Sequence, residues 1–191
     1  MNTRAASTIL SVWTYFLIVA FSFFGMCLQA VLAPLTWPFD RGRLVTGRIY
    51  RLCACGVTKL NPLWDFRVVT PVPPYRPGAS GAARPRPPAR PRRPGAVSNR
   101  GSQTDPFLIS HLPWEMKWLG KASLFKVPVM GWCMWLAGDI PVVRGNSRSA
   151  KAAMARCRKY VEGGTPVMIF PEGTRSLDGD LGPFKDGAFL L

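Results

Sequence analysis

Residues 97–107, VSNRGSQTDPF, gather in one short loop the kinds of side chain that hold a catalytic base. Asn99 and Ser102 offer hydrogen-bonding groups, and Asp105 offers a carboxylate immediately before a proline. In proton-transfer catalysis, such a carboxylate orients the side chain that accepts the proton. The side chain that would serve as the base here is Arg100, but arginine stays protonated far above neutral pH. The loop therefore has the surroundings of a catalytic base without the base itself.

Two later segments bring cationic side chains to the ends of predicted strands. GDIPVVRG, residues 138–145, carries Arg144, and VMIFPEGTRS, residues 167–176, turns at Pro-Glu-Gly before Arg175. A guanidinium group binds phosphate through two parallel hydrogen bonds, so both arginines are predicted to contact an anionic substrate. Lys121 is a further point charge for this role, and the alternative for all three is a solvated surface cation.

The elements that must position these groups alternate between helix and strand after Asp105. Apolar periodicity and turn residues predict a helix at 106–112, a strand at 116–120, a helical stretch through 136, a strand at 140–143, a helix capped by Asn146 or Ser147, and a strand at 165–170. The helix after the cap should bury Ala150, Ala153, Met154, Cys157 and Val161 and end at Gly163 and Gly164. This alternation predicts an α/β domain whose functional loops lie at the carboxyl ends of the strands.

Ahead of this domain, residues 9–35 are dense in apolar side chains, and no charged residue lies between Arg4 and Asp40. A helix of this length measures about 40 Å at roughly 1.5 Å per residue, which exceeds the ~30 Å hydrocarbon layer. A cleaved signal peptide is the alternative, but its apolar region is only about 7–15 residues long, so an uncleaved membrane helix is favoured. Basic residues at 41, 43, 48, 51 and 59 place the following chain on the cytosolic or stromal side.

Three segments separate the membrane helix from the α/β domain. Residues 43–60 mix apolar and basic positions, which predicts either an interfacial helix or an ordinary half-buried one. Residues 65–70, DFRVVT, are expected to form a first strand. Residues 71–96 hold 9 Pro, 6 Arg, 5 Ala and 3 Gly, so we expect a solvated linker that buries too little apolar surface to fold.

The composition of residues 71–96 has three interpretations. PRPPAR at 85–90 fits a proline-rich ligand of an SH3-type groove, and the six arginines could hold RNA or acidic lipid. Pro, Arg, Ala and Gly are also the residues of GC-rich codons, so an out-of-frame or retained stretch of the gene would read the same way. An unstructured or artefactual insert is favoured over a dedicated binding motif.

Charge and cysteine content narrow the class of partner. The formal net charge is +15, from 25 Lys+Arg against 10 Asp+Glu, which indicates an anionic partner such as nucleic acid, an acidic membrane surface or a phosphorylated substrate. The five cysteines are odd in number and lack CxxC pairing, which predicts free thiols in a reducing compartment. Because His111 is the sole histidine, no metal site is predicted.

The cation-bearing segments resemble the motifs of the glycerolipid acyltransferases, the enzymes that acylate glycerol 3-phosphate and lysophosphatidic acid. FPEGTRS at 170–176 matches the family's glycerol-phosphate motif at every residue, GDIPVVRG is similar to its second motif, and KASLFKVPVMGW, from Lys121, is similar to the region between. The resemblance covers residues 97–191 in the family's motif order. It implies an α/β fold with a mixed or parallel sheet behind an N-terminal membrane helix, and acyl-CoA as co-substrate with no cofactor.

The resemblance also implies roles for individual residues. The family's first motif supplies a histidine as general base for the acceptor hydroxyl and an aspartate that orients it; Asn99, Ser102 and Asp105 lie in register with that motif, and Arg100 stands at the position of the histidine. Substrate-binding residues implied by the family are Asn99, Ser102, Lys121, Arg144, Glu172, Gly173, Thr174 and Arg175. His111 does not reproduce the motif's spacing, and we expect a surface or capping histidine there.

The predicted function is acyl transfer from acyl-CoA to the free hydroxyl of lysophosphatidate, which gives phosphatidate. The first alternative is a catalytically silent relative that binds phospholipid or acyl-CoA, and the second is a Pro/Arg-rich interaction protein that uses residues 71–96. Expected partners are lysophospholipid, acyl-CoA and membrane lipid, with no nucleic acid. The expected location is the endoplasmic reticulum membrane with the domain on its cytosolic face, or else the plastid envelope.

The expected organisation is a membrane helix and a basic helix over residues 1–64, a first strand at 65–70, an insert at 71–96 and an acyltransferase-like domain over 97–191. The sequence ends at GAFLL, where the resembled family continues with a further strand and helices. We therefore expect the α/β domain to be incomplete, with an unpaired sheet edge.

The apolar stretch predicts how firmly the protein is held by membranes. Membranes that contain the chain should retain it after an alkaline carbonate wash and after high salt, because burial of apolar side chains rather than charge attraction holds it. Immunoblots of the pellet and supernatant measure this. Release into the supernatant would instead indicate peripheral attachment through the arginines.

Overall fold

A computed structural model describes residues 3–40, 42–62, 64, 96–97, 104–173, 184–185 and 187. The strand predicted at 65–70 and nearly all of the segment 71–96 lie outside this part of the chain, as do loop residues 98–103. The domain boundaries drawn from the sequence therefore stay predictions.

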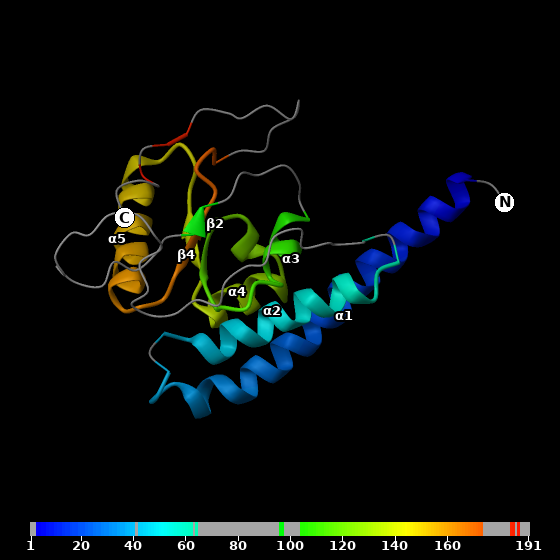
Figure 1. The fold of residues 1–191 in the computed structure, drawn as a ribbon, viewed down its shortest axis with the longest axis horizontal. Coiled ribbons are helices and arrows are strands. Elements are labelled where there is room, and N and C mark those ends of the chain that lie inside the picture. The colour runs from blue at the N-terminus through cyan, green and yellow to red at the C-terminus, as the bar shows by residue number, and fades with distance from the viewer. Residues whose placement is uncertain are drawn as a thin grey trace, which may run out of the picture.

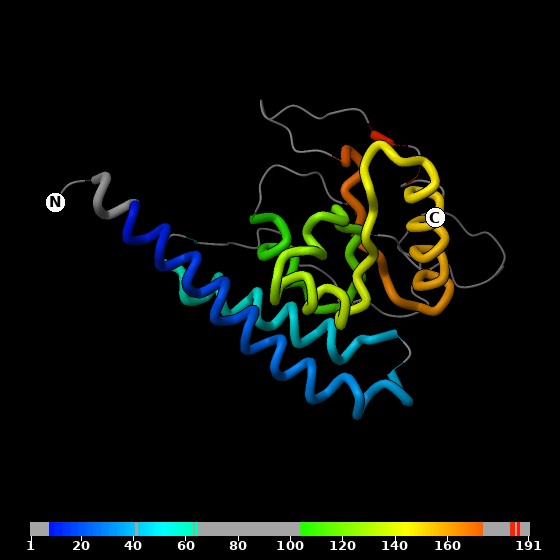
Figure 2. Tube along the Cα trace, turned by 180° about the vertical axis from the view of Figure 1, so that it is seen from behind, coloured from blue at the N-terminus to red at the C-terminus, as the bar shows by residue number. Residues whose placement is uncertain are grey.

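Two long helices form an N-terminal hairpin. Helix α1, Thr3–Thr36, is followed by α2, Leu44–Lys59, which returns along it (Figures 1 and 2). The stretch Thr8–Thr36 has a mean hydropathy of 2.3, and by length and composition it is a candidate membrane span. Large side chains along α1, among them Tyr15, Val19 and Phe24, are more than half exposed, as expected for a helix that meets lipid.

The helix predicted over residues 43–60 is present as α2, and one side of it is buried. Ile49, Cys53 and Val57 lie in that buried face, whereas Leu52 and Leu60 are exposed. The buried Gln29 of α1 donates hydrogen bonds to the carbonyl oxygen of Thr46 in α2, at 2.8 Å, and to that of Cys133, at 3.3 Å. Helix α2 thus packs as a half-buried helix, and its contact with a membrane interface stays a prediction.

The described strands form one parallel sheet in the order β1-β4-β2-β3. Their bounds are Ala96–Val97 for β1, Lys117–Lys121 for β2, Ile140–Val142 for β3 and Val167–Ile169 for β4. Strands β2, β3 and β4 each lie within three residues of the strand expected there, whereas β1 was not predicted and begins at Ala96, the last residue of the expected linker. The α/β class is confirmed. Because every neighbouring pair is parallel, the carboxyl ends of these strands meet at one edge of the sheet.

The two faces of the sheet are covered differently (Figure 1). Successive residues of β4 point to opposite faces: Val167 and Ile169 pack in a core with α5, Ser147–Glu162, whereas Met168 packs with Met116 and Trp118. Three shorter helices, α3 (Asp105–Ile109), the 3₁₀ helix η1 (Leu124–Lys126) and α4 (Met130–Ala137), complete the described domain. Contacts of α4 with α1 and α2 join this domain to the N-terminal hairpin.

Helix α5 follows its prediction except at one residue. The Asn146 side chain accepts a hydrogen bond from the Ser149 backbone N–H at 2.9 Å, which confirms Asn146 as the N-cap. Cys157 and Val161 are buried as expected. The prediction that Ala150 is buried is wrong. This residue lies in the first turn of the helix beside the exposed loop 143–146, so its side chain is exposed rather than packed in the core.

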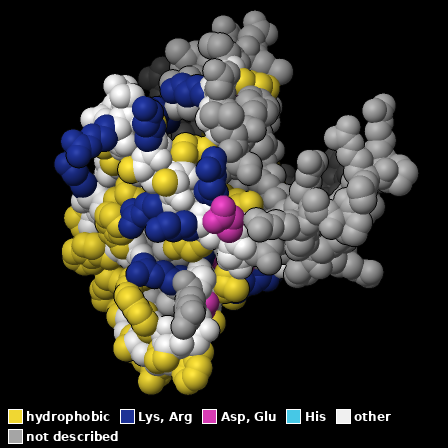
Figure 3. All heavy atoms as spheres, turned by 90° about the vertical axis from the view of Figure 1, so that its left-hand side faces the viewer, with side chains coloured by type: hydrophobic (Ala, Val, Ile, Leu, Met, Phe, Trp, Pro, Cys, Tyr) yellow, Lys and Arg dark blue, Asp and Glu magenta, His cyan; other side chains and the backbone are white. Residues whose placement is uncertain are grey.

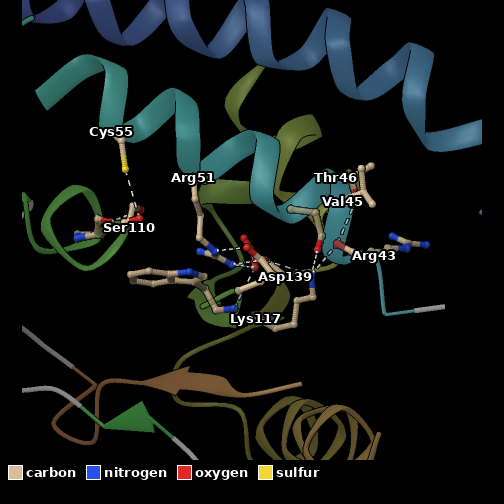
Figure 4. Close-up of polar contacts among 12 residues, drawn as sticks. Arg43, Val45, Thr46, Arg51, Cys55, Ser110, Lys117 and Asp139 are labelled. Atoms are coloured by element: carbon tan, nitrogen blue, oxygen red, sulfur yellow. Dashed lines mark hydrogen bonds and ion pairs between the residues drawn. The ribbon is translucent and has the colours of Figure 1, made fainter. Parts of the chain in front are cut away.

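Four buried charged residues join α2 to the amino ends of β2 and β3 (Figure 4). Arg51 of α2 donates to both carboxylate oxygens of Glu115, at 2.8 and 2.9 Å, and its guanidinium lies 5.3 Å from the ring centre of Trp118. The Asp139 carboxylate accepts from the Trp118 backbone N–H at 2.9 Å and lies 3.9 Å from Arg51. Lys117, with no exposed surface, is the second cation of this cluster.

The Lys117 ammonium group donates hydrogen bonds at two helix ends in addition to its place in the charge cluster. It donates to the carbonyl oxygens of Arg43, where α2 begins, at 2.8 Å, and of Ala137, where α4 ends, at 2.7 Å. Its third neighbour is the Glu115 carboxylate at 3.4 Å. With Arg51, Glu115 and Asp139 the cluster has two positive and two negative groups, so its formal charge cancels within the interior.

Replacing Lys117 with Met should destabilise the fold strongly. The change leaves an excess negative charge and two carbonyl oxygens without their donor, so the free energy of unfolding should fall by about 3–5 kcal/mol. Urea unfolding of the detergent-solubilised chain, followed by tryptophan fluorescence, measures this. The exposed Lys126 is the matched control, and Lys126→Met should stay within about 0.5 kcal/mol of wild type. Equal stability of the two variants would contradict the anchoring role of Lys117.

The pKa of Asp139 predicts how the stability of the fold depends on pH. Burial raises the pKa of Asp139 from 3.8 to about 6, against the opposing effects of Arg51, the Trp118 N–H and Lys117. Because the folded-state pKa is the higher one, the group's stabilising contribution is complete below pH 3.8 and is lost as the pH rises through about 6. The stability of wild type relative to Asp139→Asn should therefore be greater at about pH 4.5 than at about pH 7.5. A pH-independent difference in unfolding midpoints would contradict the raised pKa.

Candidate active site

The strand register places the predicted substrate-binding groups at one edge of the sheet. Lys121 ends β2 and is paired with Val142 of β3, two residues before Arg144. Trp118 of β2 is paired with Met168 of β4, and Glu172 follows four residues later, in the turn after that strand. Neighbouring strands are about 4.8 Å apart. This carboxyl edge therefore brings together backbone positions from three segments that are distant in sequence.

The Pro-Glu-Gly segment forms a tight turn at the carboxyl end of β4. The Gly173 N–H donates to the Phe170 carbonyl oxygen at 3.0 Å, and Gly173 has a φ of +65°, which disfavours any residue with a Cβ. Glu172 is buried in the turn with 5% of its surface exposed. The Lys185 N–H donates to the Pro171 carbonyl oxygen at 3.0 Å, which holds a later piece of chain against the turn.

One cationic side chain lies at this turn, and two others lie at the ends of β2 and β3. Lys121 and Arg144 are exposed at the ends of β2 and β3, and so is Lys185 beside Gly173. The Lys185 ammonium nitrogen would lie 2.9 Å from a Cβ at position 173, so a side chain there would meet the lysine as well as the strained backbone. Exposed cationic side chains near one buried carboxylate can bind an anionic ligand whose hydroxyl group also donates a hydrogen bond.

The structure describes only part of the predicted site. Asp105 is the first residue of α3 and is partly buried. Lys121, Arg144, Glu172 and Gly173 lie at the carboxyl edge as expected from the strand pattern. The remaining predicted residues, Asn99, Arg100, Ser102, Thr174 and Arg175, lie outside the described residues. Their roles, and that of Asp105 toward a base, stay predictions.

His111 is bound to the N-terminal hairpin. Its Nε2 lies 2.6 Å from the Thr58 hydroxyl of α2. Burial, assisted by the positive charge of Lys59, lowers the pKa of His111 below its usual value. The neutral ring therefore predominates at pH 7, and its hydrogen bond ties the end of α3 to α2.

Sequence reasoning missed the buried charge cluster and Lys185. A lysine between the apolar Met116 and Trp118 in a predicted strand was the available signal for the cluster, but its partners come from α2 and from the start of β3. Lys185 carried no signal, because its contact with Gly173 depends on how the chain folds back. Within the described residues, no group of three or more metal-ligating side chains occurs, and all five cysteines are free thiols.

The fold and the carboxyl edge define a class of protein, which comparison with solved structures identifies. The crystal structure of the 1-acyl-sn-glycerophosphate (LPA) acyltransferase from Thermotoga maritima has the same fold, with a TM-score of 0.63, over 98% of this chain and 69% of that one. Sequence identity between the two is 19%, so the comparison concerns the fold alone. This chain is thus an apolar helical hairpin joined to an acyltransferase-type parallel α/β domain.

The family follows from the sequence comparisons. The family model described as Acyltransferase matches residues 95–191, and the chain belongs to this acyltransferase family. It is 43% identical over 95 residues to the chloroplastic 1-acyl-sn-glycerol-3-phosphate acyltransferase of Brassica napus, which covers 50% of this chain and 28% of that protein. With the 1-acyl-sn-glycerol-3-phosphate acyltransferase of Chlamydomonas reinhardtii it shares 35% identity over 162 residues, or 84% of this chain and 44% of that protein. The chain thus spans less than half the length of either relative.

Proposed function

We propose that this chain carries the substrate site of a 1-acylglycerol-3-phosphate O-acyltransferase, the class of enzyme that transfers an acyl group from acyl-CoA to the free hydroxyl of lysophosphatidate. The observation that carries the proposal is the buried Glu172 in a Pro-Glu-Gly turn, beside strand ends that bear Lys121 and Arg144. Its relatives in Brassica napus and Chlamydomonas reinhardtii are named 1-acyl-sn-glycerol-3-phosphate acyltransferases, which supports lysophosphatidate as the acceptor. Phosphatidate is the product.

In this reaction the acceptor hydroxyl oxygen attacks the thioester carbonyl carbon. The bond from that carbon to sulfur breaks, and the hydroxyl proton ends on the CoA thiol. Arg144, Arg175 and Lys121 bind the acceptor phosphate, while Glu172 accepts a hydrogen bond from the glycerol hydroxyl. Gly173 permits close approach of the backbone to the ligand.

The proton transfer is the step that this sequence leaves incomplete. A hydroxyl is a poor nucleophile until a base accepts its proton, and Asp105 would orient such a base. Arg100 occupies that position and instead suits an ion pair with Asp105. A catalytically silent relative that binds phospholipid or acyl-CoA is therefore the second candidate function.

The membrane is the natural source of the lipid acceptor. Helix α1, the candidate span, would keep the domain at the surface where lysophosphatidate resides. Two relatives are named as chloroplastic, which supports the plastid envelope beside the endoplasmic reticulum as a location. A proline-rich partner at residues 85–90 stays a prediction on residues outside the described part.

The phosphate role predicts the behaviour of two arginine variants. Arg144→Ala and Arg175→Ala should each weaken binding of a non-reactive lysophosphatidate analogue by about 1.5–3 kcal/mol, the scale of a lost charge-assisted hydrogen bond. Calorimetric titration of the chain in neutral detergent measures this, and Lys126→Ala serves as the control. Unchanged affinity in both arginine variants would remove the phosphate-binding role.

The missing base predicts the activity of the chain itself. The unmodified chain should show little or no transfer, because a general base contributes about 10²–10⁴ in rate. Removing residues 71–95, which leaves β1 intact, and changing Arg100→His, in a chain extended with the C-terminal part of a relative, should restore transfer of radiolabelled acyl groups. Asp105→Asn in that background should lower the rate again. Robust transfer by the unmodified chain that survives Asp105→Asn would contradict the assigned catalytic loop.

A further inference from the structure

Helix α5 carries a concentration of positive charge that the proposed reaction does not use. Of its 16 residues, five are Lys or Arg and one, Glu162, is acidic. The five cations are exposed and lie on the side of the helix opposite the core residues Ala153, Cys157 and Val161: Arg148, Lys151, Arg156, Arg158 and Lys159. Figure 3 views this side of the molecule and shows Lys and Arg gathered there with little acidic surface between them. We call these five residues the α5 basic face.

The amino-terminal turns of α5, with Arg148 and Lys151, lie at the carboxyl edge of the sheet, whereas the carboxyl end of the helix approaches the start of α2, where Tyr160 and Arg43 both lie against Gly138. Helix α5 packs on the Val167 and Ile169 face, whereas the hairpin joins the domain through α4 and the cluster at Arg51 (Figure 1). Arg148 and Lys151 are therefore the cations of this face that lie farthest along α5 from the hairpin. A soluble anion fits this orientation better than a bilayer surface does.

The same face begins at the candidate active site. Arg144 lies at the carboxyl edge, the N-cap Asn146 follows, and Arg148 and Lys151 occupy the first turns of α5. From Arg148 to Lys159 the basic face extends about 17 Å along the helix. Positive charge thus continues from the edge of the sheet outward along α5.

Direct acyl transfer requires two anionic substrates to be bound together. Lysophosphatidate carries its phosphate close to the reacting hydroxyl, whereas the phosphates of acyl-CoA lie at the far end of a long pantetheine arm. Their like charges repel each other, so binding both at once is favoured when each phosphate group has cations of its own. Lys121, Arg144 and Arg175 are assigned to the acceptor phosphate, so other cations must match the phosphates of the donor.

We propose that the α5 basic face binds the phosphorylated nucleotide end of acyl-CoA while the thioester reaches the carboxyl edge of the sheet. This inference rests on the proposed function, since it takes acyl-CoA as the donor. Arg148 and Lys151 are the residues of the face nearest that edge, and they contact the 3′-phosphate and diphosphate groups.

The test compares two variants with the same change in charge. Arg148→Glu/Lys151→Glu alters the basic face, and Lys59→Glu/Lys126→Glu alters exposed cations on the hairpin and η1. Binding of CoA and of 3′-dephospho-CoA to the full chain in neutral detergent is measured by calorimetry. Wild type and the control should prefer CoA, whereas the α5 variant should bind CoA about tenfold or more weakly and lose that preference. Arg148→Gln/Lys151→Gln, which avoids charge reversal, should fall between them.

The other outcomes separate the two proposals. CoA affinity equal to wild type in both α5 variants overturns the α5 site and leaves the acyltransferase function standing. If no version binds CoA, the donor assigned in the proposed function fails and the α5 site fails with it. If the α5 variants keep CoA affinity but lose adsorption to phosphatidylglycerol vesicles relative to phosphatidylcholine vesicles, the face meets anionic lipid and the CoA proposal is overturned.

Discussion

The four-charge cluster of Arg51, Glu115, Lys117 and Asp139 is the constraint on which the arrangement of this protein depends. A buried ion loses its hydration, so each of these groups requires the others at hydrogen-bonding distance. Arg51 belongs to α2, whereas the other three residues precede or begin strands. The cluster therefore fixes the position of the hairpin relative to the sheet. Lys117 extends this control to the start of α2 and the end of α4.

The charge cluster and the proposed substrate site occupy opposite edges of the same sheet. The cluster lies where β2 and β3 begin, and Lys121, Arg144 and Glu172 lie where strands end. Separating the two has a physical advantage, because the anchor needs a dry, neutral environment whereas the carboxyl edge keeps exposed cations for an anionic ligand. A parallel sheet supplies both, since all its strands begin on one side and end on the other.

The sequence predicted the local structure well and the long-range structure less well. Apolar periodicity and an Asx-type cap were sufficient to locate α5 and its Asn146 N-cap, and the PEG turn followed from proline and glycine. The strand order and the Arg51–Glu115 pair, 64 residues apart, depend on tertiary pairing that no local pattern encodes. Ala150 was misplaced because periodicity identifies a face of a helix but not where the core beneath it ends. The contact of Lys185 with Gly173 could not be predicted either, because it depends on how the chain folds back.

The central claim is that the carboxyl edge of the sheet binds the phosphate and glycerol of lysophosphatidate. Photolabelling tests it most directly, with a lysophosphatidate analogue that carries a diazirine at the free hydroxyl position and with peptide mapping by mass spectrometry. The account predicts labelling of the peptides that contain Lys121, Arg144 or Glu172, and competition by unlabelled lysophosphatidate. Labelling confined to the hairpin, or to the peptides around Glu115 and Asp139 at the amino edge, would contradict it.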